Sequence, residues 1–458
     1  VDSVDVGDSL DADELALVEE LFPVDLPTAL QLAGANSLQV ALAAERLSAA
    51  LTRVEQADAR WLPSVRVGFS YNRHNGRIQA TDGNISEVSR GSFFAGGGLG
   101  SGTAPLNGGA GGPPRFAVDL SVAEIVFEPL AARQVVEVVA AEQNATFNQT
   151  LLESAVAYLR LVTAQAQLNS LGEIRADVRQ MVDLAEAYAA AGEGKVADVQ
   201  RAKAELARWE HAEFGRQEEV RMASIELARI LRLEPGTLLT ATDDRLLSWS
   251  FFGDEPIDHL IAQAVAGRPE MSRASAQTRA ASADIAREHW RPYLPHLMLG
   301  FSGGAFGGDK GSQWKNVSDR TDVDVAAIWE LENFGWGNIA RRELASNRHR
   351  QARIEADITR DQIVAQVVAA NQRCRIRRSA IRAAETRLDA ATKSMTAALL
   401  GIREGVQLPL EAQQSVSAVA DARLALLDAI ASYNLAQLQQ LHAVGTPASE
   451  SAVVRSTK

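Results

Sequence analysis

The feature of this 458-residue sequence that most limits its fold is a helical stretch too long for a compact domain. Segment 131–191 contains no proline and a single glycine, Gly172, and its apolar residues have helical spacing. A helix of about 60 residues extends roughly 90 Å at about 1.5 Å per residue, whereas helices of globular domains average about 11–12 residues. Such a helix buries its apolar side only against helices of similar length. The sequence therefore predicts a coiled coil or a helical cylinder.

The same order of elements occurs twice along the chain. Segments WLPSVRVGFSYN (61–72) and YLPHLMLGFSGG (293–304) both begin with an aromatic residue and Leu-Pro, and both have Gly-Phe-Ser at the same offset. Each follows a helical stretch, 26–60 or 257–291, and precedes a Gly-rich segment, a second extended segment and a long helix that breaks once. The repeat is thus a half-molecule and not a solenoid unit of roughly 20–50 residues.

These patterns predict the organisation of the chain. We expect an N-terminal extension (1–25), a first repeat (26–233), a linker (234–256), a second repeat (257–445) and a C-terminal tail (446–458). In order along the chain, the expected strands and hairpin turns are strands at about 63–72 and 115–126, a turn near 192–197, strands at about 295–303 and 321–331, and a turn near 404–409. The Gly-rich segment 91–114 is expected to be a loop without a packed core.

The expected strands alternate apolar residues with polar or small ones. In the first strand, Val65, Val67 and Phe69 alternate with residues such as Arg66 and Ser70. Nine or ten residues is about the length that crosses a bilayer when a strand is tilted, and this alternation is typical of a transmembrane barrel. A half-buried soluble sheet shows the same alternation, so the pattern alone leaves both interpretations open.

Aromatic residues near the helix-proximal ends of the strands favour the barrel, because barrels carry aromatic girdles at the membrane interface. These residues are Trp61, Trp290, Tyr293, Trp329, Phe334 and Trp336. One chain supplies only four strands, and open sheet edges do not lie in lipid. The barrel is therefore expected to close by oligomerisation, with eight strands from two copies or twelve from three.

Composition argues against several function classes. The formal net charge of −12 and the pI near 5.2 argue against nucleic acid as a partner, since phosphate binding needs a basic face. With a single cysteine, Cys374, the chain has neither a disulfide framework nor a cysteine metal site. The histidines form no HExxH motif, and GGGLGSG (96–102) lacks the Lys-Ser/Thr of a phosphate loop. We expect no enzyme activity, no cofactor and no bound metal.

Two observations bear on cellular location. No run of about 18 apolar residues is present, so no transmembrane helix is predicted. The first residues lack the positive and apolar regions of a signal peptide, so an exported form of this chain is expected to be the mature protein after signal peptide removal.

The sequence resembles the TolC family of outer-membrane efflux proteins over about 26–445. The resemblance is carried by the strand starts Leu62-Pro63 and Leu294-Pro295, by Phe127 and Phe334 where second strands give way to long helices, and by two turns, GEGKVADVQRA (192–202) and GVQLPLEAQQS (405–415). In each turn an acidic residue, Asp198 or Glu411, follows the first glycine by six positions. The second turn departs from the family in having Pro409, and Gln414 where a second acidic residue often stands.

The resemblance implies a mainly α fold with transmembrane β: a long-helix α-barrel, and a trimeric twelve-stranded β-barrel to which each protomer contributes four strands, with an internal two-fold repeat. It also implies a homotrimer in outer-membrane lipid with a large periplasmic portion. Members of the family are passive exit ducts of tripartite efflux or type I secretion systems. An inner-membrane pump supplies their energy, and a periplasmic adaptor docks on the tip of the helical barrel.

The same resemblance suggests site residues. Three copies of Glu411 would form a carboxylate ring that favours cations, with Gln414 and Asp198 lining the same periplasmic gate. The plainer interpretation of Glu411 is a helix N-terminal carboxylate favoured by the macrodipole. The expected adaptor-docking tips are Gly192, Gly194, Lys195, Val196, Gly405, Val406 and Gln407. Charged residues expected to face the barrel interior are Arg66, Asp119, Asp322, Asp324 and Glu330.

A different class of function remains open on the sequence. A soluble periplasmic or surface coiled-coil scaffold, whose strands form a small sheet without channel activity, would show the same long helices. Detergent dependence separates the two, because an exposed apolar barrel belt aggregates in plain buffer whereas a scaffold stays monodisperse.

Overall fold

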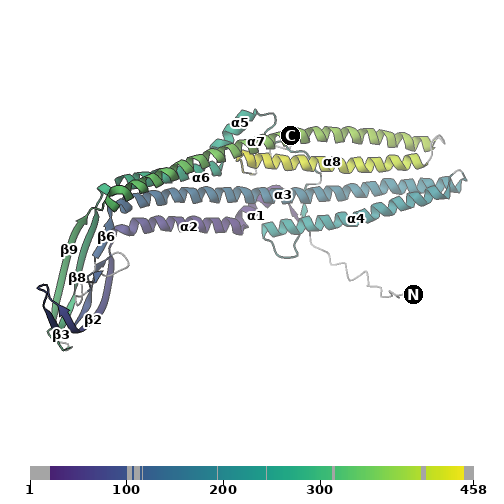
Figure 1. Ribbon diagram of the computed structural model, residues 1–458. Helices are drawn as coiled ribbons and strands as arrows, with labels where there is room; N and C mark the ends of the chain where they lie inside the picture. The colour runs from purple at the N-terminus through teal and green to yellow at the C-terminus, as the bar shows by residue number, and fades with distance from the viewer. Residues whose placement is uncertain are drawn as a thin grey trace, which may run out of the picture. The chain divides into compact units, whose positions relative to one another are not determined.

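The computed structural model of the chain describes residues 21–100, 106–107, 114–115, 117–192, 194–243, 245–311, 315–403 and 409–447. The chain forms two compact units. Unit 1 comprises 1–44, 142–271 and 359–458, and unit 2 comprises 45–141 and 272–358. Four helices have residues in both units, namely α2 (Leu38–Asp58), α3 (Val122–Ala190), α6 (Pro269–Trp290) and α7 (Trp336–Arg403) (Figure 1).

Unit 1 is built on two antiparallel helical hairpins. The long helices α3 and α7 have 69 and 68 residues, which confirms that the chain forms helices far beyond the length of a compact domain. Their partners are α4 (Val196–Leu231) and α8 (Pro409–Val444), each of 36 residues. Within the unit the helices follow the order α4, α3, α8, α7 (Figure 1). Helices α3, α4 and α8 meet in a core that includes Leu161, Leu227 and Leu438, all fully buried.

The helix before each first strand is split, where the sequence predicted one continuous helix. Segment 26–60 forms α1 (Leu26–Asn36) and α2, and segment 257–291 forms α5 (Ile257–Gly267) and α6. At the breaks Ser37 and Arg268 have extended backbones, with ψ of 124° and 133°. Arg268 precedes Pro269, whose ring disfavours helical backbone in the residue before it. At the first break the Ser37 hydroxyl accepts from Val40 N–H (3.4 Å), so Ser37 acts as the N-cap of α2, a place where serine is preferred.

The linker between the repeats is ordered by its contacts in unit 1. Strand β7 (Leu238–Ala241) pairs in parallel with β1 (Leu21–Val24), which lies in the predicted N-terminal extension. Side-chain amides of the helices accept from the linker backbone: Ala241 N–H donates to Gln165 (3.1 Å), Trp249 N–H to Asn434 (2.8 Å) and Phe251 N–H to Gln437 (3.1 Å). Because Asn434 and Gln437 are buried, each contact satisfies a polar group on both sides.

The strands of unit 2 form one antiparallel sheet. Its members are β2 (Ser64–Gln79), β3 (Ile85–Gly100), β6 (Ala117–Ser121), β8 (His296–Lys310) and β9 (Ser318–Ile328). Strands β3 and β6 follow one another along the same edge of β8, because Leu99 pairs with Phe301 and Ala117 with the next residue, Gly300. The two pieces act as one strand, so the described part of this sheet has four strands, as predicted. Between them lie β4 (Leu106–Asn107) and β5 (Pro114–Arg115), which pair with each other.

The prediction of a loop throughout 91–114 is wrong for residues 91–100, which belong to β3. Gly96 pairs with Gly304 of β8, and a Cβ on Gly96 would lie 2.6 Å from the Cα of Gly304. Glycine is therefore required here by the close approach of two backbones, and its abundance does not prevent a strand. The predicted strand 115–126 is also too long, because α3 already begins at Val122. The Ser121 hydroxyl accepts from Glu124 N–H (3.4 Å) at this helix start.

Candidate functional site

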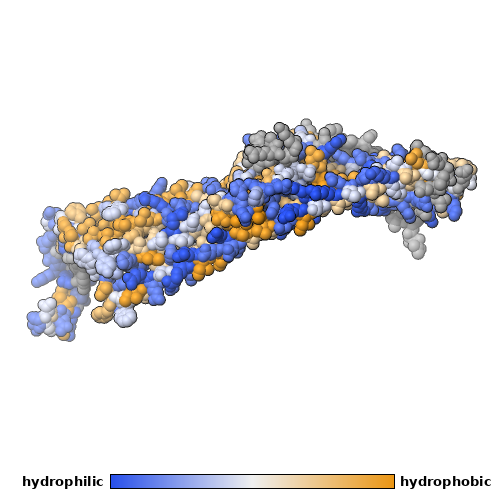
Figure 2. Space-filling view, turned by 90° about the horizontal axis from the view of Figure 1, so that it is seen from above, coloured by the Kyte–Doolittle hydropathy of each residue, from blue (hydrophilic) through white to orange (hydrophobic). Residues whose placement is uncertain are grey.

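The sheet of unit 2 has one apolar and one polar face. Residues paired across strands share a face, since side chains alternate along each strand. The apolar face carries Val65, Val67, Phe69, Tyr71, Leu99, Leu297, Leu299, Phe301, Val323 and Val325. Several of these are largely exposed in the single chain, up to 83% for Val67 and 76% for Val325. Figure 2 shows hydrophobic side chains gathered at the surface of the strand-bearing part, and among the described residues much of this apolar face is left uncovered.

The opposite face is polar. The charged residues that the sequence placed together, Arg66, Asp119, Asp322 and Asp324, all share it by register, whereas Glu330 lies beyond the end of β9. Arg320 of the same face donates to the Asp322 carboxylate (2.8 and 3.1 Å) and lies over the Phe306 ring. Charged groups cost free energy when they are removed from water, so this face of the sheet suits contact with water and not with an apolar layer.

Three of the six aromatic residues predicted for the membrane interface lie together. The rings of Trp290 and Tyr293 are 6.3 Å apart between centroids, and Trp329 Nε1 donates to the Tyr293 carbonyl (3.3 Å). The others, Trp61, Phe334 and Trp336, are exposed. Phe334 is 95% exposed at a φ of 58°, a left-handed conformation that costs a non-glycine residue about 1–2 kcal/mol. The turn between β9 and α7 thus presents an aromatic ring to the surroundings at a cost in backbone energy.

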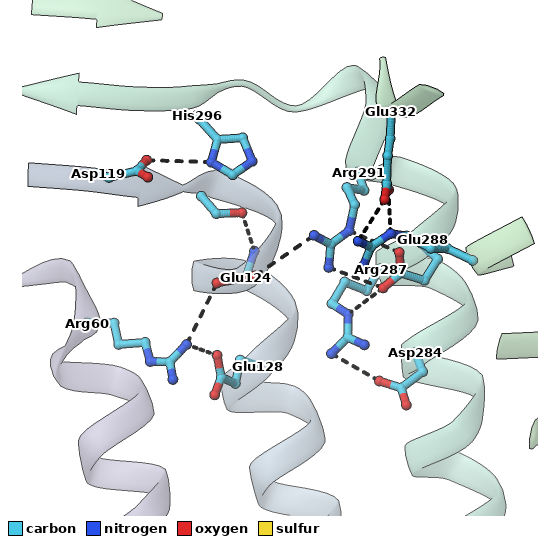
Figure 3. Close-up of polar contacts among 12 residues, drawn as sticks. Arg60, Asp119, Glu124, Glu128, Asp284, Arg287, Glu288, Arg291, His296 and Glu332 are labelled. Carbon is cyan, nitrogen blue, oxygen red and sulfur yellow. Dashed lines mark hydrogen bonds and ion pairs between the residues drawn. The ribbon is translucent and has the colours of Figure 1, made fainter. Parts of the chain in front are cut away.

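A chain of ion pairs lies where the helices of unit 2 meet the sheet (Figure 3). Arg60, in the short turn that follows α2, contacts Glu128 and Glu124 of α3, the latter at 4.0 Å. Arg291 continues the chain from Glu124 (3.9 Å) to Glu288 of α6 (2.9 Å). Glu288 also accepts from Arg287 (3.1 Å), so two guanidinium groups face a carboxylate whose side chain is only 8% exposed. The ion pairs thus connect α3 and α6 with the turn that follows α2. They lie close to the starts of β2 and β8 and to the end of β6.

Two further pairs extend this junction. Arg341 of α7 donates to Glu332, in the turn between β9 and α7 (3.0 Å), and this hydrogen bond holds the pKa of the Glu332 carboxyl below its usual range. His296 Nδ1 lies 3.5 Å from Asp119 across the β6–β8 pair. Of the junction residues the sequence singled out only Asp119, as a residue facing the barrel interior, and it predicted none of the ion pairs. The available signal was an arginine shortly before each Leu-Pro, at Arg60 and Arg291. Carboxylates stand one helical turn before Arg291, at Glu288, and near the start of the following long helix, at Glu124 and Glu128.

The first hairpin turn of unit 1 is shaped by its glycines. Gly192 has a φ of 80°, which only glycine adopts without strain, and Gly194 N–H donates to the Tyr188 carbonyl (3.0 Å). Lys195 and Val196 follow as exposed residues at the start of α4. The predicted tip residues of the second turn, Gly405, Val406 and Gln407, lie outside the described residues.

The three predicted gate residues lie near the starts of two helices, α4 and α8. Asp198 lies in the first turn of α4 and pairs with Arg201 (3.3 Å). Glu411 is exposed in the first turn of α8. Gln414 is exposed one turn further on and lines a groove of about 630 Å³ between α4 and α8, together with Arg201 and other residues of both helices.

The floor of this groove contains a carboxylate that the sequence did not single out. Glu205 accepts from Trp209 Nε1 (3.0 Å) and from the Ser417 hydroxyl (3.1 Å), and it pairs with Arg208. Burial alone would raise the pKa of Glu205, but the hydrogen bonds from Arg208 and Ser417 outweigh it and lower the pKa. Glu205 is therefore a charged link between the two hairpins.

None of the helices in the described part of the chain is apolar over enough length to span a bilayer. Nor do three or more His, Cys, Asp or Glu side chains come together there in a way that suits a metal ion.

The chain is similar to outer-membrane proteins in sequence and in fold. Residues 260–446 match the family described as outer membrane efflux protein. No curated protein sequence matches the chain. Similar solved structures include the outer membrane protein VceC of Vibrio cholerae, with 16% identity, 92% of this chain and 96% of that chain covered, and a TM-score of 0.71.

The outer membrane channels CmeC of Campylobacter jejuni and MtrE of Neisseria gonorrhoeae are comparably similar. Each has 15% identity and a TM-score of 0.71; the matches cover 94% and 93% of this chain, and 88% and 89% of the channel chains. The predicted resemblance is confirmed: the second repeat is similar in sequence to outer membrane efflux proteins, and nearly the whole chain shares the fold of those channels, which combines an α-barrel with a β-barrel.

Proposed function

We propose that the chain is one subunit of a homotrimeric exit duct in the outer membrane, which conducts substrates passively from the periplasm to the exterior. One observation carries this proposal. The sheet is apolar on one face and polar on the other, and within the described residues its outer strands β2 and β9 each pair on one side only. Unpaired strand edges are not tolerated in lipid, so β9 of one copy pairs with β2 of the next. Three copies supply twelve strands.

The two faces then have different surroundings. The exposed apolar face contacts acyl chains, and the aromatic cluster of Trp290, Tyr293 and Trp329 lies at the membrane interface. The polar face lines a hydrated bore. This assignment explains why the chain exposes so much apolar surface on one side of a sheet and so much charge on the other.

The helical hairpins form the periplasmic portion of the duct. In a tripartite efflux or type I secretion system, an inner-membrane pump supplies the energy and a periplasmic adaptor docks at the hairpin tips. Lys195 and Val196 are exposed beside the turn and are the side chains that we expect an adaptor to touch first. Gly192 and Gly194 shape that turn, and Gly405, Val406 and Gln407 have the corresponding place in the second hairpin.

The assembly is tested by its dependence on detergent and by its mass. We expect the purified protein to require detergent, to have the mass of three chains and to produce ion-conducting steps in a planar lipid bilayer. A single chain that stays monodisperse in plain buffer and conducts nothing would instead identify the soluble scaffold.

The periplasmic gate is a separate part of the proposal. Three copies of Glu411, with Gln414 and Asp198 nearby, form a polar ring that attracts cations at the narrow end. We expect Glu411→Ala to weaken block of the conductance by divalent cations at the periplasmic side. Glu210→Ala is the matched control, because Glu210 is a carboxylate of α4 far from the turns. Unchanged block in Glu411→Ala would assign Glu411 to the helix terminus alone.

A further inference from the structure

The polar face of the sheet in unit 2 carries a row of basic residues at the end that lies away from the helices (Figure 1). There His74 of β2 pairs with Arg90 of β3, and Arg90 pairs with Lys310 of β8. His74 stands eight positions from Arg66, and Lys310 stands eight positions from Ser302, so the three residues lie on the polar face. We call His74, Arg90 and Lys310 the basic row.

No carboxylate accompanies the basic row on this part of the polar face among the described residues. The neighbouring polar-face positions are Asn72, Gly76, Ile78, Ser86, Val88, Ser92 and Gly308. The segments that join the strands, 101–116 and 311–317, contain Arg115 and Lys315 but no Asp or Glu. Asp82, in the turn between β2 and β3, stands eight positions from both His74 and Arg90. The positive charge is therefore not balanced locally.

The opposite face of the sheet does not offset this charge. At the same level of the strands it carries Arg73 and Arg77 together with Glu87 and Asp309, so its own positive and negative groups balance. Lys310 is exposed and forms no ion pair with any described residue. The net positive charge at this end of the sheet thus belongs to the polar face.

Closer to the helices the polar face has the opposite balance. Its described charges there are three carboxylates and two guanidinium groups, those of Asp119, Asp322, Asp324, Arg66 and Arg320. Lys310 is eight residues from Ser302, the partner of Asp322, which corresponds to about 26 Å along the strand at roughly 3.3 Å per residue. Charges in salt solution act over about 8 Å at physiological ionic strength, so a solute meets the two zones separately.

The chemistry of the basic row suits an anion. Rings of Arg and Lys side chains around a pore favour anions, including phosphates. In addition, Nε2 of His74 is buried and has no hydrogen-bond partner among the described residues. Buried polar atoms in folded proteins normally have a partner, so the described part of the chain does not by itself satisfy the basic row.

We infer that the exterior mouth of the duct carries an anion-binding ring, formed by the basic rows of three copies. The inference rests on the proposed trimer, in which the polar face lines the bore, and it names the class of solute that the mouth holds: solutes with phosphate or carboxylate groups. Arg90 and Lys310 are charged whether or not His74 is protonated. The two ends of the duct then differ, because the proposed gate attracts cations at the periplasmic end.

Block of the conductance by a polyanion tests the ring. Tripolyphosphate in the exterior chamber of a planar bilayer should block wild-type channels at a lower concentration than tripolyphosphate in the periplasmic chamber. Lys310→Glu reverses one charge in each copy and should raise the half-blocking concentration from the exterior side at least about tenfold, since charged sites change local counter-ion concentrations by about that factor or more.

The matched control is Arg73→Glu. It makes the same change of charge next to His74 in the sequence, but on the opposite face of the sheet. Its half-blocking concentration should change less than about twofold, because the reversed charge lies outside the bore and is screened by salt.

Chemical modification of assembled channels gives a measurement that does not depend on folding of a charged variant. In a Cys374→Ser background, Lys310→Cys places a thiol at an exposed position of the basic row. A thiol reagent that attaches an ammonium group should restore block by tripolyphosphate, and one that attaches a sulfonate should not. The same channel is measured before and after the reaction, so a folding defect cannot produce this difference.

The outcomes separate this inference from the proposed function. A conducting trimer in which Lys310→Glu leaves the block unchanged overturns the ring and leaves the duct standing. An equal loss of block in Arg73→Glu and Lys310→Glu also contradicts the ring, because it would show an effect of overall charge. A protein that has the mass of one chain in detergent and conducts nothing overturns the proposed function, and the ring with it.

Discussion

Strands β2 and β8 begin with nearly the same sequence, but they occupy different places in the sheet. Among the described strands, β2 lies at an edge and pairs only with β3, whereas β8 lies in the middle and pairs on both sides. The shared Gly-Phe-Ser is followed by Tyr71-Asn72 in β2 and by Gly303-Gly304 in β8. The two copies of the repeat diverge at the point where β8 comes against the glycines of β3.

The reason is the space available to a side chain. Asn72 is exposed, but a Cβ on Gly304 would lie 2.5 Å from the Cα of Gly96. The serine of the shared motif is also less exposed in the central strand: Ser70 of β2 is half-buried, whereas Ser302 of β8 is only 3% exposed. Duplication therefore supplies the strand, and its place in the sheet decides which side chains the strand can carry.

The strongest test of this comparison is to give the central strand the residue of the edge strand. Gly304→Asn should prevent β3 from pairing with β8 and should cost at least about 3 kcal/mol of folding free energy, because the added atoms collide with backbone. We expect no assembled oligomer in detergent. The reciprocal change Asn72→Gly should cost about 1 kcal/mol or less. An assembled Gly304→Asn protein as stable as Asn72→Gly would show that β3 and β8 are not so close.

A second test compares the ion pairs at the two helix–strand junctions. Glu288 is buried between Arg287 and Arg291, whereas Glu128 and its partner Arg60 are substantially exposed. Glu288→Ala should lower the free energy of unfolding by about 3 kcal/mol, because it leaves guanidinium groups without a buried counter-charge. Glu128→Ala should cost less than about 1 kcal/mol. Thermal unfolding of both variants by circular dichroism measures the difference, and equal effects would contradict the assigned burial.

The smallest expected effect concerns the helix breaks. Ser37 separates α1 from α2 without a charged contact of its own side chain, whereas Arg268, 5% exposed, donates to Glu270 at the α5–α6 break (2.6 and 3.1 Å). Burial would raise the pKa of Glu270, but the bonds from Arg268 outweigh it and the pKa is lowered. A lowered pKa in the folded state stabilises the fold above the unfolded value of about 4.3, and that stability is lost as pH falls through the folded value.

Thermal unfolding between pH 7 and pH 3.5 measures this contribution. Glu270→Gln should have a lower unfolding temperature than the wild type at pH 7, and the gap should narrow as the solution becomes acidic. Ser37→Ala should shift the unfolding temperature equally at both ends of the range. A gap for Glu270→Gln that does not change with pH would remove Glu270 from the acid sensitivity of the fold.

Periodicity predicted the regular elements well where one pattern extended over many residues. The proline-free run at 131–191 correctly predicted a helix far too long for a compact domain, and the Leu-Pro repeat located two strands. Prediction was weakest where a neighbour decides the outcome. A Gly-rich segment forms β3 because β8 supplies glycines opposite it, and the linker is ordered because Asn434 and Gln437 accept from its backbone.

The site residues divide in the same way. The alternation in β2 and β9 was sufficient to separate an apolar from a polar face, because side chains along a strand alternate whatever the fold. The junction ion pairs were out of reach. Arg60 and Glu124 are far apart in sequence, and only the packing of the helices brings them together.

The sequence by itself determined that this chain forms long helices, that its order of elements is duplicated and that its strands have two unlike faces. These are properties of local spacing and of chain geometry. The tertiary structure alone decided which strand is central, which helices lie at the edges, and that Glu288 is buried between two arginines. Such outcomes depend on contacts between distant residues, and the free energy of burial or close approach has no local signature in the sequence.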